Sequence, residues 1–139
     1  MHAERGEVSL GPLVAMMLLA GVIATLPIFL IADRREHALE ASEQTDLRNA
    51  MSGAQLYFVD RGSFSGFTPQ VAEQYEPSAA FTTGASAPGR ISIRGVTDST
   101  IVMVTESGSG AVLCVAATHD LVTYGRVDTS TASSCFGGW

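Results

Sequence analysis

An uninterrupted apolar run near the start of the chain constrains its fold more than any other feature. Residues 8–32 contain 25 positions without a charged side chain, between charged clusters at 4–7 and 33–36. An α-helix needs roughly 20 apolar residues, at about 1.5 Å each, to cross the hydrocarbon core of a bilayer. The run therefore predicts a single membrane-spanning helix, assigned to residues 7–32.

A cleavable signal peptide is the competing interpretation of this run. Such peptides place a basic segment before an apolar segment of about 7–15 residues. Here the preceding segment carries Glu4, Arg5 and Glu7 and is not basic, although the small residues of "VIA" at 22–24 offer a cleavage position. We therefore expect the helix to be retained, with release of a secreted domain as the alternative.

The helix is expected to continue past the apolar run, because no turn-forming residues follow Ala32. Residues 33–62 are rich in Ala, Leu, Glu, Arg and Gln, which favour helices. Gly62 is the predicted stop, and Pro27 within the run predicts a kink. An apolar stripe at helical spacing predicts a face that packs on the rest of the chain, formed by Leu47, Ala50, Met51, Ala54 and Phe58.

The remaining residues, 63–139, are expected to form a long loop followed by a small antiparallel β-sheet. Gly, Ser, Thr and Pro dominate the loop at 62–89, whose expected anchors are Phe64, Phe67, Tyr75 and Phe81. Alternating or β-branched segments predict four strands, at 90–96, 99–106, 111–120 and 121–127. The expected fold class is therefore α+β, with the sheet packed over the apolar stripe of the helix.

The chain has two cysteines, Cys114 and Cys135. A bridge between them closes a loop worth about 3 kcal/mol by a chain-entropy estimate, a large gain for so small a core. Two free buried thiols are the alternative. Disulfides persist in oxidising compartments, so pairing favours a head outside the cytoplasm. Arg34 and Arg35, which follow the run, favour the opposite orientation, and we give the cysteines more weight.

Charge and side-chain chemistry argue against several classes of function. The chain has eight basic and fourteen acidic residues, a net charge of −6, so we expect no direct binding of nucleic acid, which needs clustered cations. Cys114, His119 and Asp120 form the one concentrated reactive set, but residues five apart on a strand are about 16 Å apart. We therefore expect no enzyme activity, no bound metal and no cofactor.

The segment "TDLRNAMSGAQLYFVDRGSFSG" at 45–66 resembles type IV pilins and pseudopilins, in which a similar helix end precedes a Gly-Ser-aromatic step. The strand "LCVAATHD" with its late cysteine resembles the sheet and disulfide-bounded region of that family. The resemblance implies a single-pass membrane protein with an extracytoplasmic head, stored in the lipid bilayer before assembly. It also implies a structural subunit, major or minor, that joins other pilin subunits through the N-terminal helix in a pilus or secretion filament.

The same resemblance implies a leader over residues 1–6, cut by a prepilin peptidase between Gly6 and Glu7. The family carries an acid at the fifth position of the mature chain, where this sequence has Gly11. This departure fits a minor subunit or a chain that is never processed. The alternative function is therefore a membrane-anchored, extracytoplasmic binding module that does not assemble into filaments.

Overall fold

The computed structural model describes the backbone of residues 10–139 and the side chains of residues 11, 14–18 and 34–139. The chain divides into two compact units, with the boundary between Arg35 and Glu36. The predicted leader at 1–6 and the predicted cleavage between Gly6 and Glu7 lie outside the described residues.

Helix α1 (Leu10–Arg61) contains 52 residues and remains helical through Pro27, where the kink stays a prediction. The helix ends where the sequence predicted. Gly62 has a φ of +71°, and its N–H donates to the carbonyl oxygen of Phe58 at 2.7 Å. Glycine adopts this left-handed backbone at little cost because it has no Cβ.

The prediction of a membrane span is wrong for the described part of the chain. No helix among the described residues is both long enough and apolar enough to cross a bilayer. This finding contradicts the membrane-spanning helix of the predicted fold class and the predicted single-pass membrane localisation.

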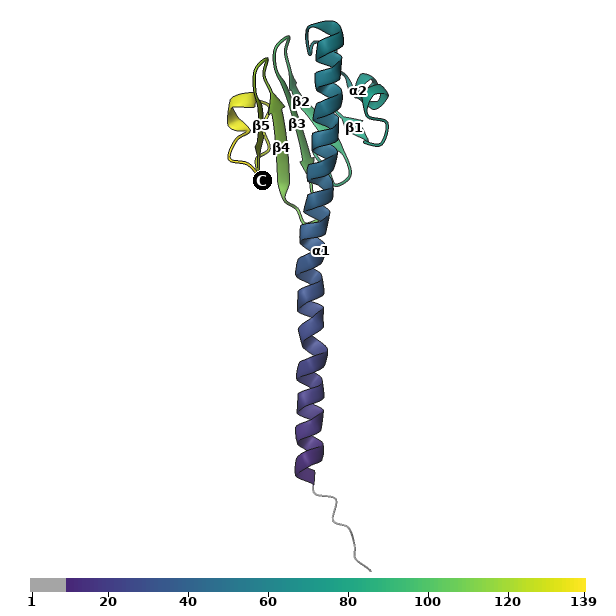
Figure 1. Ribbon diagram of the computed structural model, residues 1–139, viewed down its shortest axis with the longest axis vertical. Helices are drawn as coiled ribbons and strands as arrows, with labels where there is room; N and C mark the ends of the chain where they lie inside the picture. Colours follow the sequence, from purple (N-terminus) through teal and green to yellow (C-terminus); the bar gives the residue numbers. More distant parts are fainter. Residues whose placement is uncertain (1–9) are drawn as a thin grey trace, which may run out of the picture. The chain divides into compact units, whose positions relative to one another are not determined.

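The sheet lies in the unit that begins at Glu36. Its five strands follow one another in space in chain order: β1 (Phe81–Thr82), β2 (Ile91–Val96), β3 (Ile101–Glu106), β4 (Val112–Ala117) and β5 (Val122–Gly125). Strands β2 to β5 form an antiparallel meander (Figure 1), at the four segments predicted as strands. Strand β1 pairs in parallel with β2, so the predicted antiparallel sheet is wrong and the sheet is mixed.

The segment at 62–89, predicted as a loop, contains β1 and a short helix, α2 (Pro69–Tyr75). The hydroxyl of Thr68 caps α2 by accepting the N–H of Val71 at 3.4 Å, and Pro69 begins the first turn. Strand β1 has two residues, too few for a pattern to reveal. The predicted aromatic anchors are confirmed, since all four pack into or against the core: Phe64, Phe67, Tyr75 and Phe81.

The second half of α1 covers one face of the sheet, which we call the α1 face (Figure 1). The predicted stripe is confirmed: Leu47, Ala50, Met51 and Ala54 are at most 2% exposed, and Phe58 packs beside them. Alternate residues of β3 and β4 meet the stripe: Ile101, Met103, Leu113, Val115 and Ala117. The opposite face, which we call the outer face, carries Val102, Val104, Cys114 and Ala116.

One carboxylate ties α1 to the sheet. Glu43 is half-buried and accepts two hydrogen bonds, from the N–H of Gly89 at 3.0 Å and from the hydroxyl of Thr105 at 3.1 Å. Thr105 is fully buried, and its one hydroxyl proton has two acceptors within reach, this carboxylate and the carbonyl oxygen of Arg90 at 2.9 Å. The pair of bonds fixes the helix against β3 and the loop before β2.

Candidate functional site

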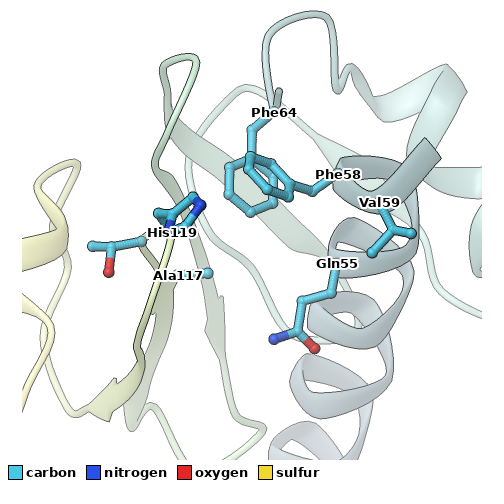
Figure 2. Close-up of a pocket in the computed structure, with 7 residues that line it drawn as sticks. Gln55, Phe58, Val59, Phe64, Ala117 and His119 are labelled. Atoms are coloured by element: carbon cyan, nitrogen blue, oxygen red, sulfur yellow. The ribbon is translucent and has the colours of Figure 1, made fainter. Parts of the chain in front are cut away.

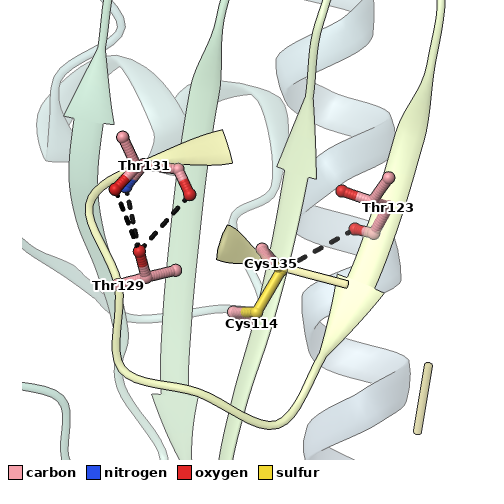
Figure 3. The surroundings of a disulfide bond; sticks show 5 residues. All are labelled: Cys114, Thr123, Thr129, Thr131 and Cys135. Carbon is pink, nitrogen blue, oxygen red and sulfur yellow. Dashed lines mark hydrogen bonds between the residues drawn. A yellow bond between two sulfur atoms is a disulfide. The ribbon is translucent and has the colours of Figure 1, made fainter. Parts of the chain in front are cut away.

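The predicted disulfide is confirmed. Cys114, in the middle of β4, is bonded to Cys135, which follows a short 3-10 helix, η1 (Ala132–Ser134). Figure 3 shows the bridge joining the strand to the C-terminal segment, with Cys135 Sγ 3.9 Å from the carbonyl oxygen of Thr123. A disulfide sulfur carries no proton, so this approach is a van der Waals contact. Both cysteines are fully buried, in the cluster of the outer face.

The residues after Cys135 lie along β5, which is the last strand of the sheet. Gly137 forms a β-bridge with Gly125, and the N–H of Gly138 donates to the carbonyl oxygen of Tyr124 at 2.9 Å. The disulfide therefore holds a short backbone segment, residues 135–139, against the free edge of β5.

The backbone of Phe136 is fixed within this segment, whereas its side chain is exposed to solvent. A Cβ on Gly125 would lie 2.6 Å from the carbonyl oxygen of Phe136 and 2.8 Å from its nitrogen, so the two backbones are in close contact. Gly125 pairs with Cys114, which belongs to the outer face, and Phe136 therefore lies on that face. The residue is 70% exposed.

Trp139, in contrast, packs on the α1 face. Its ring meets Tyr124 edge to face, with the centroids 4.6 Å apart. The guanidinium carbon of Arg48, on α1, lies 6.0 Å from the Tyr124 centroid and 5.9 Å from the Trp139 centroid. These distances suit cation–π attraction. Trp139 therefore docks on the sheet of its own chain.

A pocket of about 350 Å³ opens between the last turns of α1 and the end of β4. We call it the aromatic pocket; its lining residues are Gln55, Phe58, Val59, Phe64, Ala117, Thr118 and His119. The rings of Phe58 and Phe64 have centroids 4.6 Å apart and are tilted by 36°. Figure 2 shows His119 facing these two rings across the pocket, and its ring is 6.1 Å from that of Phe58.

A carboxylate orients the imidazole at the mouth of this pocket. His119 Nδ1 lies 2.6 Å from Asp120 Oδ1, and the two side chains are 71% and 88% exposed. Cys114, the third member of the reactive set considered from sequence, is oxidised and lies on the outer face, so it supplies no thiolate to this pair. The described residues contain no group of three His, Cys, Asp or Glu side chains that suits a metal ion.

A third feature is the apolar surface near the start of α1. The described apolar side chains there are more than half exposed: Val14, Met16, Met17 and Leu18. Val14, Met17 and Leu18 are spaced three and four residues apart and share one face of the helix.

Comparison with models of protein families, with curated proteins and with solved structures finds no match for this chain. The role of these surfaces must therefore be inferred from their own geometry.

The sequence did not reveal the aromatic pocket or the exposed position of Phe136. Phe58 and Phe64 were expected to pack in the core and to anchor the loop, and they do both while also lining the pocket. For Phe136 the available signal was an aromatic residue between a cysteine and two glycines, in "CFGG". That pattern gives no direction for the side chain, which depends on the path of the segment across β5.

Proposed function

We propose that this chain is a structural subunit that assembles through helix α1 into a filament of the type IV pilus or pseudopilus class, with copies of itself among its neighbours. The observation that carries the proposal is the exposed apolar face near the start of α1. Val14, Met17 and Leu18 are 54%, 72% and 68% exposed. Burying such a side chain contributes about 1.5–3 kcal/mol, so a helix–helix contact over this face is favourable.

The length of α1 supports the same proposal. At 52 residues it is several times longer than the average helix of a globular protein. Among the described side chains of α1, the fully buried ones fall between Leu47 and Tyr57. The chain's own sheet thus buries only a short stretch of the described helix surface, and packing between subunits provides a use for the exposed apolar side chains at 14–18.

The resemblance of 45–66 to type IV pilins and pseudopilins supports the choice of filament class. In this proposal the leader at 1–6 is removed by a prepilin peptidase, so that the assembled chain begins at Glu7. The role requires no catalysis, in keeping with the oxidised state of Cys114. The other subunits of the filament are the proposed partners, and contact is made by apolar helix surface rather than by a charged patch.

The test uses the full chain with its disulfide intact. We expect sedimentation velocity to show concentration-dependent assembly and electron microscopy to show filaments. Leu18→Glu places a charge on the exposed apolar face of α1 and should abolish assembly without unfolding the sheet. Ser42→Glu is the matched control, because it adds the same charge at an exposed polar position of the same helix. Mass spectrometry of the native protein should show a chain beginning at Glu7.

Two results would count against this function. A wild-type chain that remains monomeric at all concentrations lacks the self-assembly that the proposal requires. Equal loss of assembly in Leu18→Glu and Ser42→Glu would show that added charge, and not the apolar face, controls association. A native chain beginning at Met1 would remove the peptidase from the proposal while leaving the helix contact to be judged by sedimentation.

A further inference from the structure

Each subunit carries a projecting aromatic side chain and an aromatic pocket on opposite faces of its sheet. The projection is Phe136, on the outer face and 70% exposed. The pocket is lined by Phe58 and Phe64 and includes Ala117, a residue of the α1 face. Because the sheet separates the two features, Phe136 cannot reach the pocket of its own chain.

We propose that Phe136 of one copy of this chain docks into the aromatic pocket of a second copy. This inference rests on the proposed function. It names a contact between the sheet-bearing units of two copies, in addition to the packing of α1. The occupant is a second copy because this same chain supplies both the exposed ring and a pocket of matching chemistry.

The size and lining of the pocket suit a phenyl ring. A cavity of about 150 Å³ is known to hold benzene, and the aromatic pocket measures about 350 Å³ and is open to solvent. An entering ring meets the half-buried Phe58, which packs against the buried Phe64 and can form a tilted or edge-to-face aromatic pair with the entering ring. The imidazole of His119, held by Asp120, closes the other side (Figure 2).

Phe136 is also prepared for docking by its backbone. Cys135 on one side is fixed by the disulfide, and Gly137 on the other is fixed by its β-bridge with Gly125. A side chain presented from a fixed backbone loses little conformational freedom when it binds, so more of the burial free energy appears as affinity.

The symmetry of this contact fits a filament. Two different surfaces meet, so the docked partner still exposes its own Phe136 and the first copy still exposes its own pocket. Such heterologous contacts propagate into open helical arrays unless the rotation closes a ring. A two-fold dimer, in which each copy would use the same patch, is not expected from this pair of surfaces.

Photo-crosslinking of the full chain tests the contact directly. Benzoylphenylalanine is placed at position 136, and the chain is mixed with an isotopically labelled wild-type chain before irradiation. We expect crosslinks between the two isotopes that map to the peptides containing residues 55–64 or 117–119. Crosslinks confined to one chain, or mapped to any other region of the second chain, would overturn the proposal.

Two pairs of variants measure the contribution of the contact. Phe136→Ala should weaken self-association about tenfold or more, whereas Val127→Ala, which trims an exposed apolar residue earlier in the same C-terminal region, should not. Val59→Glu at the mouth of the pocket should weaken self-association to a similar extent, whereas Leu56→Glu, also exposed on α1, should not. All four positions are on the surface, and unchanged thermal unfolding confirms that each variant folds.

The outcomes separate this inference from the proposed function. A wild-type chain that assembles while Phe136→Ala and Val59→Glu assemble equally well overturns the docking and leaves the role of α1 intact. Loss of assembly in Leu18→Glu but not in Phe136→Ala likewise overturns the docking alone. A wild-type chain that never self-associates overturns both.

Discussion

Reduction of the bond between Cys114 and Cys135 should destabilise the folded chain substantially. The two residues are separated by 21 positions in the sequence. The entropy lost by closing a loop of this length corresponds to about 3 kcal/mol at 25 °C. The bond also secures residues 135–139 on β5, where the described backbone contacts are the bridge from Gly137 to Gly125 and the hydrogen bond from Gly138 to Tyr124.

The expected loss is large on the scale of the unit from Glu36 to Trp139. Domains of this size lose about 4–8 °C of melting temperature per kcal/mol, so reduction should lower Tm by on the order of 15 °C. With urea slopes of about 1–3 kcal/mol/M, the unfolding midpoint should fall by roughly 1–3 M. Both shifts are far outside experimental error.

Urea titrations of the oxidised and the reduced chain, followed by circular dichroism and by the fluorescence of Trp139, measure this loss. Trp139 packs on Tyr124, so its emission should move toward that of exposed tryptophan when the segment detaches. The double variant Cys114→Ala/Cys135→Ala is the control, because a reductant should not change its stability. A loss below about 1 kcal/mol would refute the loop-entropy reasoning. It would show that non-covalent contacts alone keep the segment in place.

Three further perturbations follow from particular contacts. Glu43→Ala should cost about 1.5–3 kcal/mol in urea unfolding because the N–H of Gly89 loses its carboxylate acceptor, while Thr105 keeps the carbonyl oxygen of Arg90; the exposed Glu73→Ala should cost under about 0.5 kcal/mol. Gly125→Ala should cost about 1–3 kcal/mol, since its Cβ would collide with the backbone of Phe136. Unchanged stability would mean that residues 135–139 are not held against β5. Desolvation, and then the hydrogen bond to Asp60, raise the pKa of Tyr75 above its ordinary 10.0. That contribution to stability is complete below pH 10 and is lost as the pH rises through the raised pKa, so alkaline destabilisation should be weaker in Tyr75→Phe.

The sequence predicted those parts of the fold that depend on a repeating pattern. The stripe from Leu47 to Phe58 marked the buried face of α1 because five apolar residues recur at helical spacing. The strands β2 to β5 were recognisable from alternation and β-branched residues. The cysteine pair was recognisable because a small core gains much from a bridge. The stripe and the strand patterns extend over several residues, and two cysteines allow only one pairing within the chain.

The parts that were missed depend on short segments or on tertiary context. Strand β1 has only two residues, so it shows no alternation of apolar and polar residues from which a strand or its parallel pairing with β2 could be predicted. Helix α2 did have a signal, the Thr68–Pro69 cap, which the composition of the surrounding loop concealed. The aromatic pocket needs α1 and the end of β4 to meet, and the exposure of Phe136 needs the path of residues 135–139. Neither can be read from local sequence.

The two ends of the sheet limit the ways in which copies of this chain can join. An exposed, long edge strand invites a second chain to pair with it by backbone hydrogen bonds, which is the route to amyloid-like stacking. Here one edge is β1, two residues long, and the other is occupied by the segment that follows Cys135. Strand addition is therefore disfavoured at both edges. The disulfide on the outer face thus protects the β5 edge, and its reduction should expose that edge to strand addition by a second chain.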